Sequence, residues 1–287
     1  MAISTANATE LTQEQVQKVL IQPLQDQSVF LAAGPQMFDT NGSPVRIPKA
    51  QKPDETGLEW VGENELIPET DTGFDEVLLL PDTMPSIKVI ERYSNEVARQ
   101  SIIALEAALR DNLVTAVANK LDKQFLSATG DGVTTPQGIF AYAGTQNVDV
   151  AGELTLDTVL DAWGLALSAD VNTTALRFFI RPDEYMALRK LKDGDGRYML
   201  QPDATAGSVG SVQGVPVTVS KRLPEGSAFL ADFSQIAVAR DMAPTVKILT
   251  ERYADYDQQA IRVVARFDAK PKNPEAIVTL TGITAGV

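Results

Sequence analysis

The sequence predicts a mixed α+β fold in which a long extended segment and one long helix precede a body of shorter helices and strands. Eight of the sixteen prolines in the 287-residue chain fall between Ile21 and Pro85, where apolar residues follow no helical period. Between Ser86 and Thr129 the chain has neither glycine nor proline. After Gly130, short patterns of helical and of strand period alternate.

The first elements predicted are a short helix and a long hairpin. An amphipathic pattern over 13–20 follows Thr12. Val45–Pro48 and Phe74–Leu80 are predicted to be two strands on either side of an irregular tip. Such a length of thinly cored chain between Ile21 and Pro85 is unusual within one compact domain, so we expect it to lie on another subunit.

One long amphipathic helix is predicted next. Apolar residues recur every three or four positions from Ile102 to Phe125. If the helix runs from about Ser94 to Leu126, it is roughly 50 Å long at 1.5 Å per residue. Because this exceeds the usual length of a globular helix, we expect it to act as a structural spine.

The remainder is predicted to alternate between helices and strands. Helices are expected over 156–167 and 183–191, and a glycine-rich loop over 192–214. The predicted strands are Phe178–Ile180, Val215–Ser220, Ala228–Ala231, Ile236–Ala239, Val246–Leu249, Ala260–Phe267 and Ile277–Leu280.

Composition excludes several classes of enzyme. The chain has no histidine and no cysteine, so it forms no Ser-His-Asp triad, cysteine–histidine pair, zinc–thiolate site or disulfide. We expect no cofactor and no bound metal. No apolar run reaches the ~18 residues of a membrane span, so we expect no membrane partner. The net charge of −13, with scattered basic residues, argues against tight binding of nucleic acid.

Acidic residues offer the one route to catalysis, as in a carboxylate-based hydrolase. Glu63 and Glu65, or Asp255 and Asp257, are close in sequence. The run from Asp54 to Glu76, however, holds nine acids and no base, which favours a solvated acidic surface. The hydrolase remains a distant alternative.

The order of these parts carries a family resemblance, together with several short local matches. The matching residues are Trp60–Glu63, Phe74, Ile87–Val89, Phe125–Leu126, Thr135–Ile139, Gly214–Val217, Ala231–Ser234 and Pro274–Val278. Over nearly its whole length the chain resembles the tailed-bacteriophage major capsid proteins with the Hong Kong 97 fold.

The resemblance implies a division of the chain and a structural function. It implies an N-terminal arm (1–38), an extended E-loop hairpin (39–84), a P-domain with the spine helix (85–135), an A-domain (136–250) and return strands of the P-domain (251–287). The expected function is self-assembly as pentamers and hexamers into an icosahedral shell around the phage dsDNA genome. The expected location is the virion, with the host cytoplasm during assembly.

The resemblance also implies where subunits meet, because the E-loop of this fold lies over the neighbouring subunit's spine. Residues 1–76 hold thirteen acids and four bases, so 4 − 13 = −9 of the net charge lies there. We therefore expect partly electrostatic docking. The candidate E-loop residues are Lys49, Lys52, Trp60, Glu63, Glu65, Glu69 and Asp71, and the candidate spine residues are Lys88, Arg92, Arg99 and Arg110.

Partners and alternatives follow from the same resemblance. The partners implied are other copies of the chain, a separate scaffolding protein and a portal, with dsDNA enclosed but not bound specifically. Some relatives join subunits by a Lys–Asn isopeptide bond helped by a Glu, but Asp257 and Val264 occupy the Asn and Glu positions, so we expect none. An encapsulin-type nanocompartment shell protein is the alternative within this class.

Overall fold

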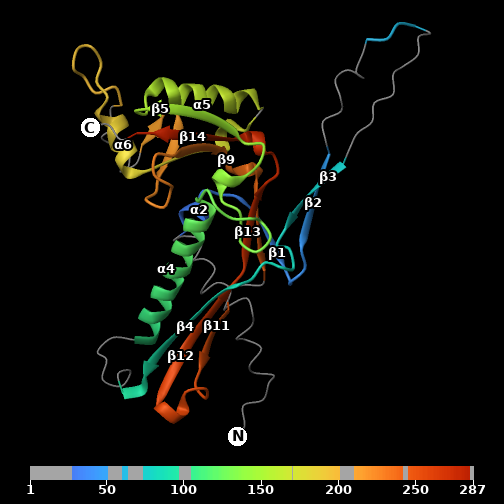
Figure 1. Cartoon of the computed structure of the whole chain (residues 1–287), viewed down its shortest axis with the longest axis vertical. Helices are drawn as coiled ribbons and strands as arrows, with labels where there is room; N and C mark the ends of the chain where they lie inside the picture. The colour runs from blue at the N-terminus through green and yellow to red at the C-terminus, as the bar shows by residue number, and fades with distance from the viewer. Residues whose placement is uncertain are drawn as a thin grey trace.

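The computed structural model describes residues 28–50, 60–63, 74–96, 105–169, 171–200, 210–241 and 245–284. Its largest sheet has six strands in the order β5-β14-β9-β6-β8-β7, with α5 along one face (Figure 1). β14 pairs in parallel with β5 and antiparallel with β9, which joins the C-terminal strand to the middle of the chain. These strands are β5 (Gln146–Gly152), β14 (Ile277–Ile283), β9 (Ala228–Asp232), β6 (Leu176–Ile180), β8 (Val215–Val219) and β7 (Ser211–Val212).

Local signals fix the two helices of this region. α5 (Leu156–Ser168) begins at Thr155, whose hydroxyl accepts the N–H of Thr158 in a capping box. α6 (Pro182–Lys190) begins with proline and carries acids in its first turn and bases in its last, as the helix dipole favours. Both helices and the strands β6, β8, β9 and β14 confirm the prediction for this part of the chain.

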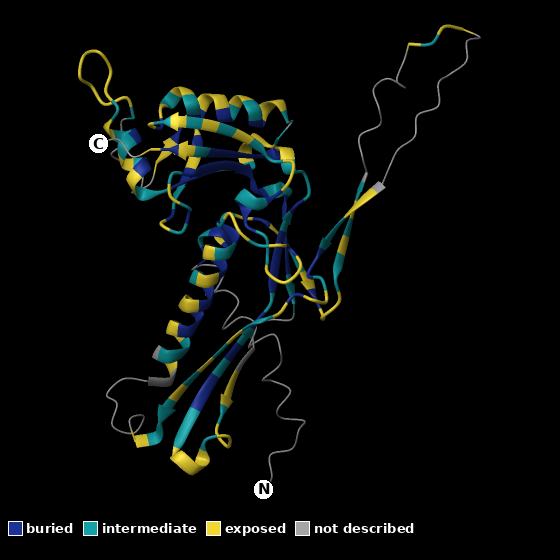
Figure 2. Ribbon diagram, in the orientation of Figure 1, coloured by how far each residue is buried: buried dark blue, intermediate teal, exposed yellow. Residues whose placement is uncertain are grey.

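A second unit is a three-stranded antiparallel sheet, in the order β11-β12-β4, packed against the long helix α4. Leu113, Val117 and Leu121 of α4 share a buried cluster with Ile261 and Val263. Figure 2 shows buried and exposed residues alternating along α4. The bounds are α4 (Leu105–Phe125), β4 (Ile87–Ser94), β11 (Thr245–Leu249) and β12 (Gln258–Ala265).

A strand that was not predicted comes before the long helix. The segment Ile87–Ser94 is strand β4, Asn95 and Glu96 are helical, and α4 is described from Leu105, so residues 97–104 of the predicted helix lie outside the described residues. The absence of glycine and proline permits either structure. Ile87, Val89 and Tyr93 all pack against the core, and their spacing in multiples of two residues is the period of a strand. This spacing favours β4 over a helix.

The predicted long strand Ala260–Phe267 is divided in two. β12 ends at Ala265, and β13 (Phe267–Pro271) joins a different three-stranded sheet, β1-β10-β13. Arg266 lies between the two strands, and its guanidinium donates to the carbonyl oxygens of Pro81 and Met84, at 2.6 and 3.0 Å. The remaining bounds are α2 (Val29–Ala32), β1 (Gln36–Thr40) and β10 (Ile236–Asp241).

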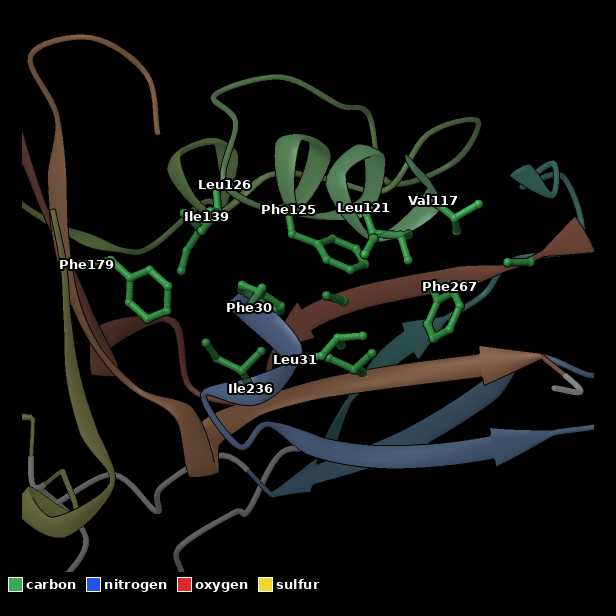
Figure 3. Close-up of a cluster of buried hydrophobic side chains, with 14 of the residues drawn as sticks. Phe30, Leu31, Val117, Leu121, Phe125, Leu126, Ile139, Phe179, Ile236 and Phe267 are labelled. Carbon is green, nitrogen blue, oxygen red and sulfur yellow. The ribbon is translucent and has the colours of Figure 1, made fainter. Parts of the chain in front are cut away.

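The main core joins the two units, and the N-terminal part of the described chain lies at its centre (Figure 3). The rings of Phe30 and Phe125 lie 5.0 Å apart, and Leu31 is also buried. β1 pairs in parallel with β10. The expectation of a thinly cored segment from Ile21 is therefore wrong for the residues from Ser28 to Thr40, because a four-residue helix is too short to leave a period.

The sequence-based domain boundaries also divide two sheets. β11, which falls within 136–250, pairs with β12 of the helix-backed sheet. β14, which falls within 251–287, lies in the six-stranded sheet. Strand pairing between distant segments therefore assigns each of these strands to the other unit.

Candidate assembly interface

A two-stranded hairpin projects away from the rest of the molecule in Figure 1. It consists of β2 (Val45–Ala50) and β3 (Phe74–Leu79), paired antiparallel from Val45 opposite Leu79 to Ala50 opposite Phe74. Both strands were predicted, and their pairing confirms a hairpin. The described segment 60–63 lies at the far end of the projection.

The far end of the hairpin presents an apolar side chain to solvent. Trp60 is fully exposed, and Glu63 is also exposed. Nearer the body, Lys49 pairs in register with Asp75, and Arg46 forms an ion pair with Glu76 at 3.0 Å. An exposed tryptophan at the end of a projection is a typical binding anchor, because burying it removes a large apolar area from water.

The root of the hairpin is fixed to the body. Leu79, Leu80 and Met84 are buried against Ala237 and Ala239 of β10. The projection therefore begins on a packed base.

A buried carboxylate holds the chain where β3 ends. Asp268 is fully buried, and its Oδ2 accepts the backbone N–H of Leu80 at 2.9 Å. Leu80 has a φ of +53°, a left-handed conformation that non-glycine residues rarely adopt. Desolvation raises the pKa of Asp268, against the opposing effects of the Leu80 N–H and Lys270. The geometry makes Asp268 a positioning residue for the hairpin.

We expect Asp268→Asn to destabilise the fold by about 1–3 kcal/mol. The side-chain NH2 group of the asparagine would then face a backbone N–H, and two donors cannot form a hydrogen bond with each other. Since folding raises the pKa of Asp268 above 3.8, its contribution is fully present below that pH and decreases as the pH rises through the raised value. Urea unfolding at pH 4 to 8 should therefore show the wild type's advantage over the variant shrinking as pH rises. An advantage that grows with pH would contradict this.

A second buried carboxylate fixes the N-terminal segment to α4. Asp122 accepts hydrogen bonds from the Ser28 hydroxyl at 2.5 Å and from the N–H groups of Val29 and Phe30 at 3.0 and 3.2 Å. Arg222 approaches its Oδ2 at 3.3 Å. Desolvation raises the pKa of Asp122, while these partners oppose the shift.

The face of the β11-β12-β4 sheet opposite α4 carries cations from all three strands. Side chains alternate along a strand, so Ile261 and Val263 face α4 and Arg262 faces away. The register then places Lys247 beside Arg262, and Lys88 and Arg92 on the same side of β4. We call Lys88, Arg92, Lys247 and Arg262 the cationic face.

The sequence-predicted residues divide into three groups. Lys88 and Arg92 lie on strand β4 and not on the spine helix, whereas Arg110 lies on α4 and is half-buried. Lys49, Trp60 and Glu63 lie on the projection. The remaining candidates, Lys52, Glu65, Glu69, Asp71 and Arg99, lie outside the described residues.

Sequence reasoning missed Lys247 and Arg262. The alternation within β12 was the available signal, because it separates Arg262 from the apolar residues on either side. Their proximity to β4 depends on strand register, which no local pattern contains.

The described residues give little support to catalysis. The groove along Lys247–Arg252 contains one carboxylate, Glu251, whereas a two-carboxylate hydrolase needs a converging pair. Among the residues described, no group of acids is arranged to hold a metal ion. In that same part of the chain, no helix has the length and apolarity to cross a membrane.

The chain shares its fold with solved capsid structures. The capsid of a native GTA particle shares the fold with a TM-score of 0.72 and 17% identity, over 90% of this chain and 91% of that one. A structure from Mycobacterium phage Bobi gives a TM-score of 0.71 and 18% identity, over 88% and 90% of the two chains.

The chain belongs to the phage capsid family, whose model matches residues 9–282. The major capsid protein of Halomonas phage phiHAP-1 is 22% identical over 255 residues, which cover 88% of this chain. The chain spans 40% of the length of that relative. The family match confirms the resemblance to tailed-phage major capsid proteins.

Proposed function

We propose that the chain is the subunit of an icosahedral shell, that it assembles as pentamers and hexamers, and that the shell encloses phage dsDNA. The observation that carries the proposal is the projecting hairpin with an exposed Trp60 at its far end. Such a projection gains its stabilising contacts from another copy. Contacts of this head-to-tail kind, repeated around an axis, generate closed rings.

The Hong Kong 97 arrangement gives each unit a role. In this proposal the hairpin is the E-loop, α4 and its sheet form the P-domain, and the six-stranded sheet with α5 forms the A-domain. A separate scaffolding protein and a portal are the further partners. The net charge of −13 suits a wall that holds DNA without binding it tightly. Assembly takes place in the host cytoplasm, and the chain has no enzymatic role.

The contents of purified particles test this function against an encapsulin. We expect nuclease-protected dsDNA in particles made with the packaging machinery, whereas a nanocompartment would contain an enzyme cargo. A folded chain that stays monomeric and hydrolyses substrates would support the distant alternative.

Docking of the acidic hairpin on the cationic face should respond to charge reversal. We expect Lys88→Glu with Arg92→Glu to lower the particle yield and to make that yield less sensitive to salt. Each exposed ion pair contributes only ~0.2–1 kcal/mol, but the shell repeats the contact in every copy, so the effects add up. Light scattering against salt concentration measures both. The matched control is Lys120→Glu with Lys123→Glu, two exposed residues of α4. Equal yields from the two variants would remove the electrostatic claim.

A further inference from the structure

Two surfaces around the six-stranded sheet carry half of the large hydrophobic side chains that are exposed in the described residues. Leu160 and Leu167 are 40% and 44% exposed on α5. Met186 on α6 is 49% exposed, and Tyr198 and Met199, in the loop that follows α6, are 53% and 54% exposed. Exposed apolar side chains that lie together on a surface mark interaction sites.

The first surface is a ridge along α5. Leu160, Gly164 and Leu167 share one side of the helix, away from its buried residues. A Cβ built at Gly164 meets no atom within 4 Å, so the ridge has an open notch between its two leucines. Asp157 and Asp161 are exposed along the same ridge. We call Asp157, Leu160, Asp161, Gly164 and Leu167 the acidic ridge.

The chain segment that contains this ridge carries charge of one sign. No lysine or arginine occurs between Lys123 and Arg177, whereas acids recur through that interval. A partner for the ridge therefore needs an apolar group to fill the notch and cations at one end.

The second surface has that composition. Met186 and Lys190 share a face of α6, with Arg189 beside Lys190 in the last turn. Lys192 lies over the Tyr198 ring at 5.0 Å. The nearby Asp193 closes its own loop by accepting the N–H groups of Asp195 and Arg197. We call Met186, Arg189, Lys190, Lys192, Tyr198 and Met199 the basic corner.

We propose that the acidic ridge of one copy packs against the basic corner of the next copy. With α5 and α6 antiparallel, Asp157 and Asp161 meet Arg189 and Lys190, and Met186 enters the notch at Gly164. The spacings along the two helices agree. Met186 lies four residues, about one turn, before Lys190 on α6, and Gly164 lies three residues after Asp161 on α5. Each copy offers both surfaces, so the contact is head-to-tail, the kind that forms a ring when the rotation between copies closes. The inference rests on the proposed shell function and identifies a capsomer contact independent of the hairpin.

Charge reversal and rescue test this contact in the full chain. We expect Asp157→Lys with Asp161→Lys, or Arg189→Glu with Lys190→Glu, to lower ring and particle yield by about tenfold in gel filtration and light scattering. The four substitutions combined should restore most of the yield. Glu153→Lys with Glu275→Lys, two exposed acids off the ridge, is the matched control and should assemble normally.

Gly164→Leu separates packing from folding, because leucine is a better helix former than glycine and fills only the notch. We expect this variant to keep a wild-type melting temperature and to lose assembly. Wild-type yield from either double reversal, or no rescue by the combined variant while it remains folded, would overturn the inference and leave the shell function standing. A wild-type chain that never assembles would overturn the shell function and this contact together.

Discussion

Replacing residues 49–75 by the dipeptide Asn-Gly is expected to give a folded chain that no longer forms closed particles. Pro48 and Glu76 are opposite each other in the hairpin, so a two-residue turn can join them. The four pairs nearest the body remain, from Val45 opposite Leu79 to Pro48 opposite Glu76. The variant keeps the buried root and loses the projection.

The result is read from a melting curve and from gel filtration. We expect a melting temperature within a few degrees of the wild type and elution as monomers or small oligomers. The matched comparison is deletion of Asp39–Leu80, which also removes Leu79 and Leu80 from the core and should unfold the body. Regular shells from the shortened hairpin would contradict the role given to it.

Asp122→Ala is expected to lower the free energy of unfolding by about 3 kcal/mol or more. The change leaves two backbone N–H groups and the Ser28 hydroxyl without their acceptor, and it removes the ion pair of Arg222 with a carboxylate that is fully buried. Because these donors hold α2 on α4, Phe30 would lose its fixed place beside Phe125. Urea unfolding measures the loss.

Asp131→Ala is the matched control, because Asp131 also accepts N–H groups, from Val133, Thr134 and Thr135, but is exposed. Water can replace its carboxylate, so the loss should be much smaller. The pH dependence should differ in sign. Hydrogen bonds from Thr134 and its neighbours lower the pKa of Asp131, so the part of the stability that depends on its titration is lost as pH falls. Burial raises the pKa of Asp122, so the corresponding part for Asp122 is lost as pH rises. Equal losses at neutral pH would contradict the assignment of Asp122.

Elements with local signals were predictable. α5 has a threonine cap, α6 has proline at its start and charges that match its dipole, and β2 and β3 are short apolar runs on either side of an irregular sequence. The segment Ile87–Ser94 was not predicted as a strand, because a residue stretch without glycine or proline suits both a helix and a strand. Only pairing with β12, more than 160 residues later in the chain, decides between them.

The residues of the cationic face were identifiable from the sequence in kind and not in position. Lys88 and Arg92 are identifiable as cations from the sequence, but their shared face with Lys247 and Arg262 depends on the register of three strands. Asp122 and Asp268 were not identified, because nothing local distinguishes a buried carboxylate from a solvated one. Their burial comes from segments distant in sequence, Ser28–Phe30 and Leu80.

Electron microscopy of the purified, full-length chain under assembly conditions is the most direct test of the shell function. We predict closed particles of uniform diameter, whose reconstruction shows rings of five and six copies with each hairpin lying over a neighbouring copy. A chain that is folded by circular dichroism and remains monomeric at all concentrations and salt conditions, with scaffolding protein present, would contradict the proposal.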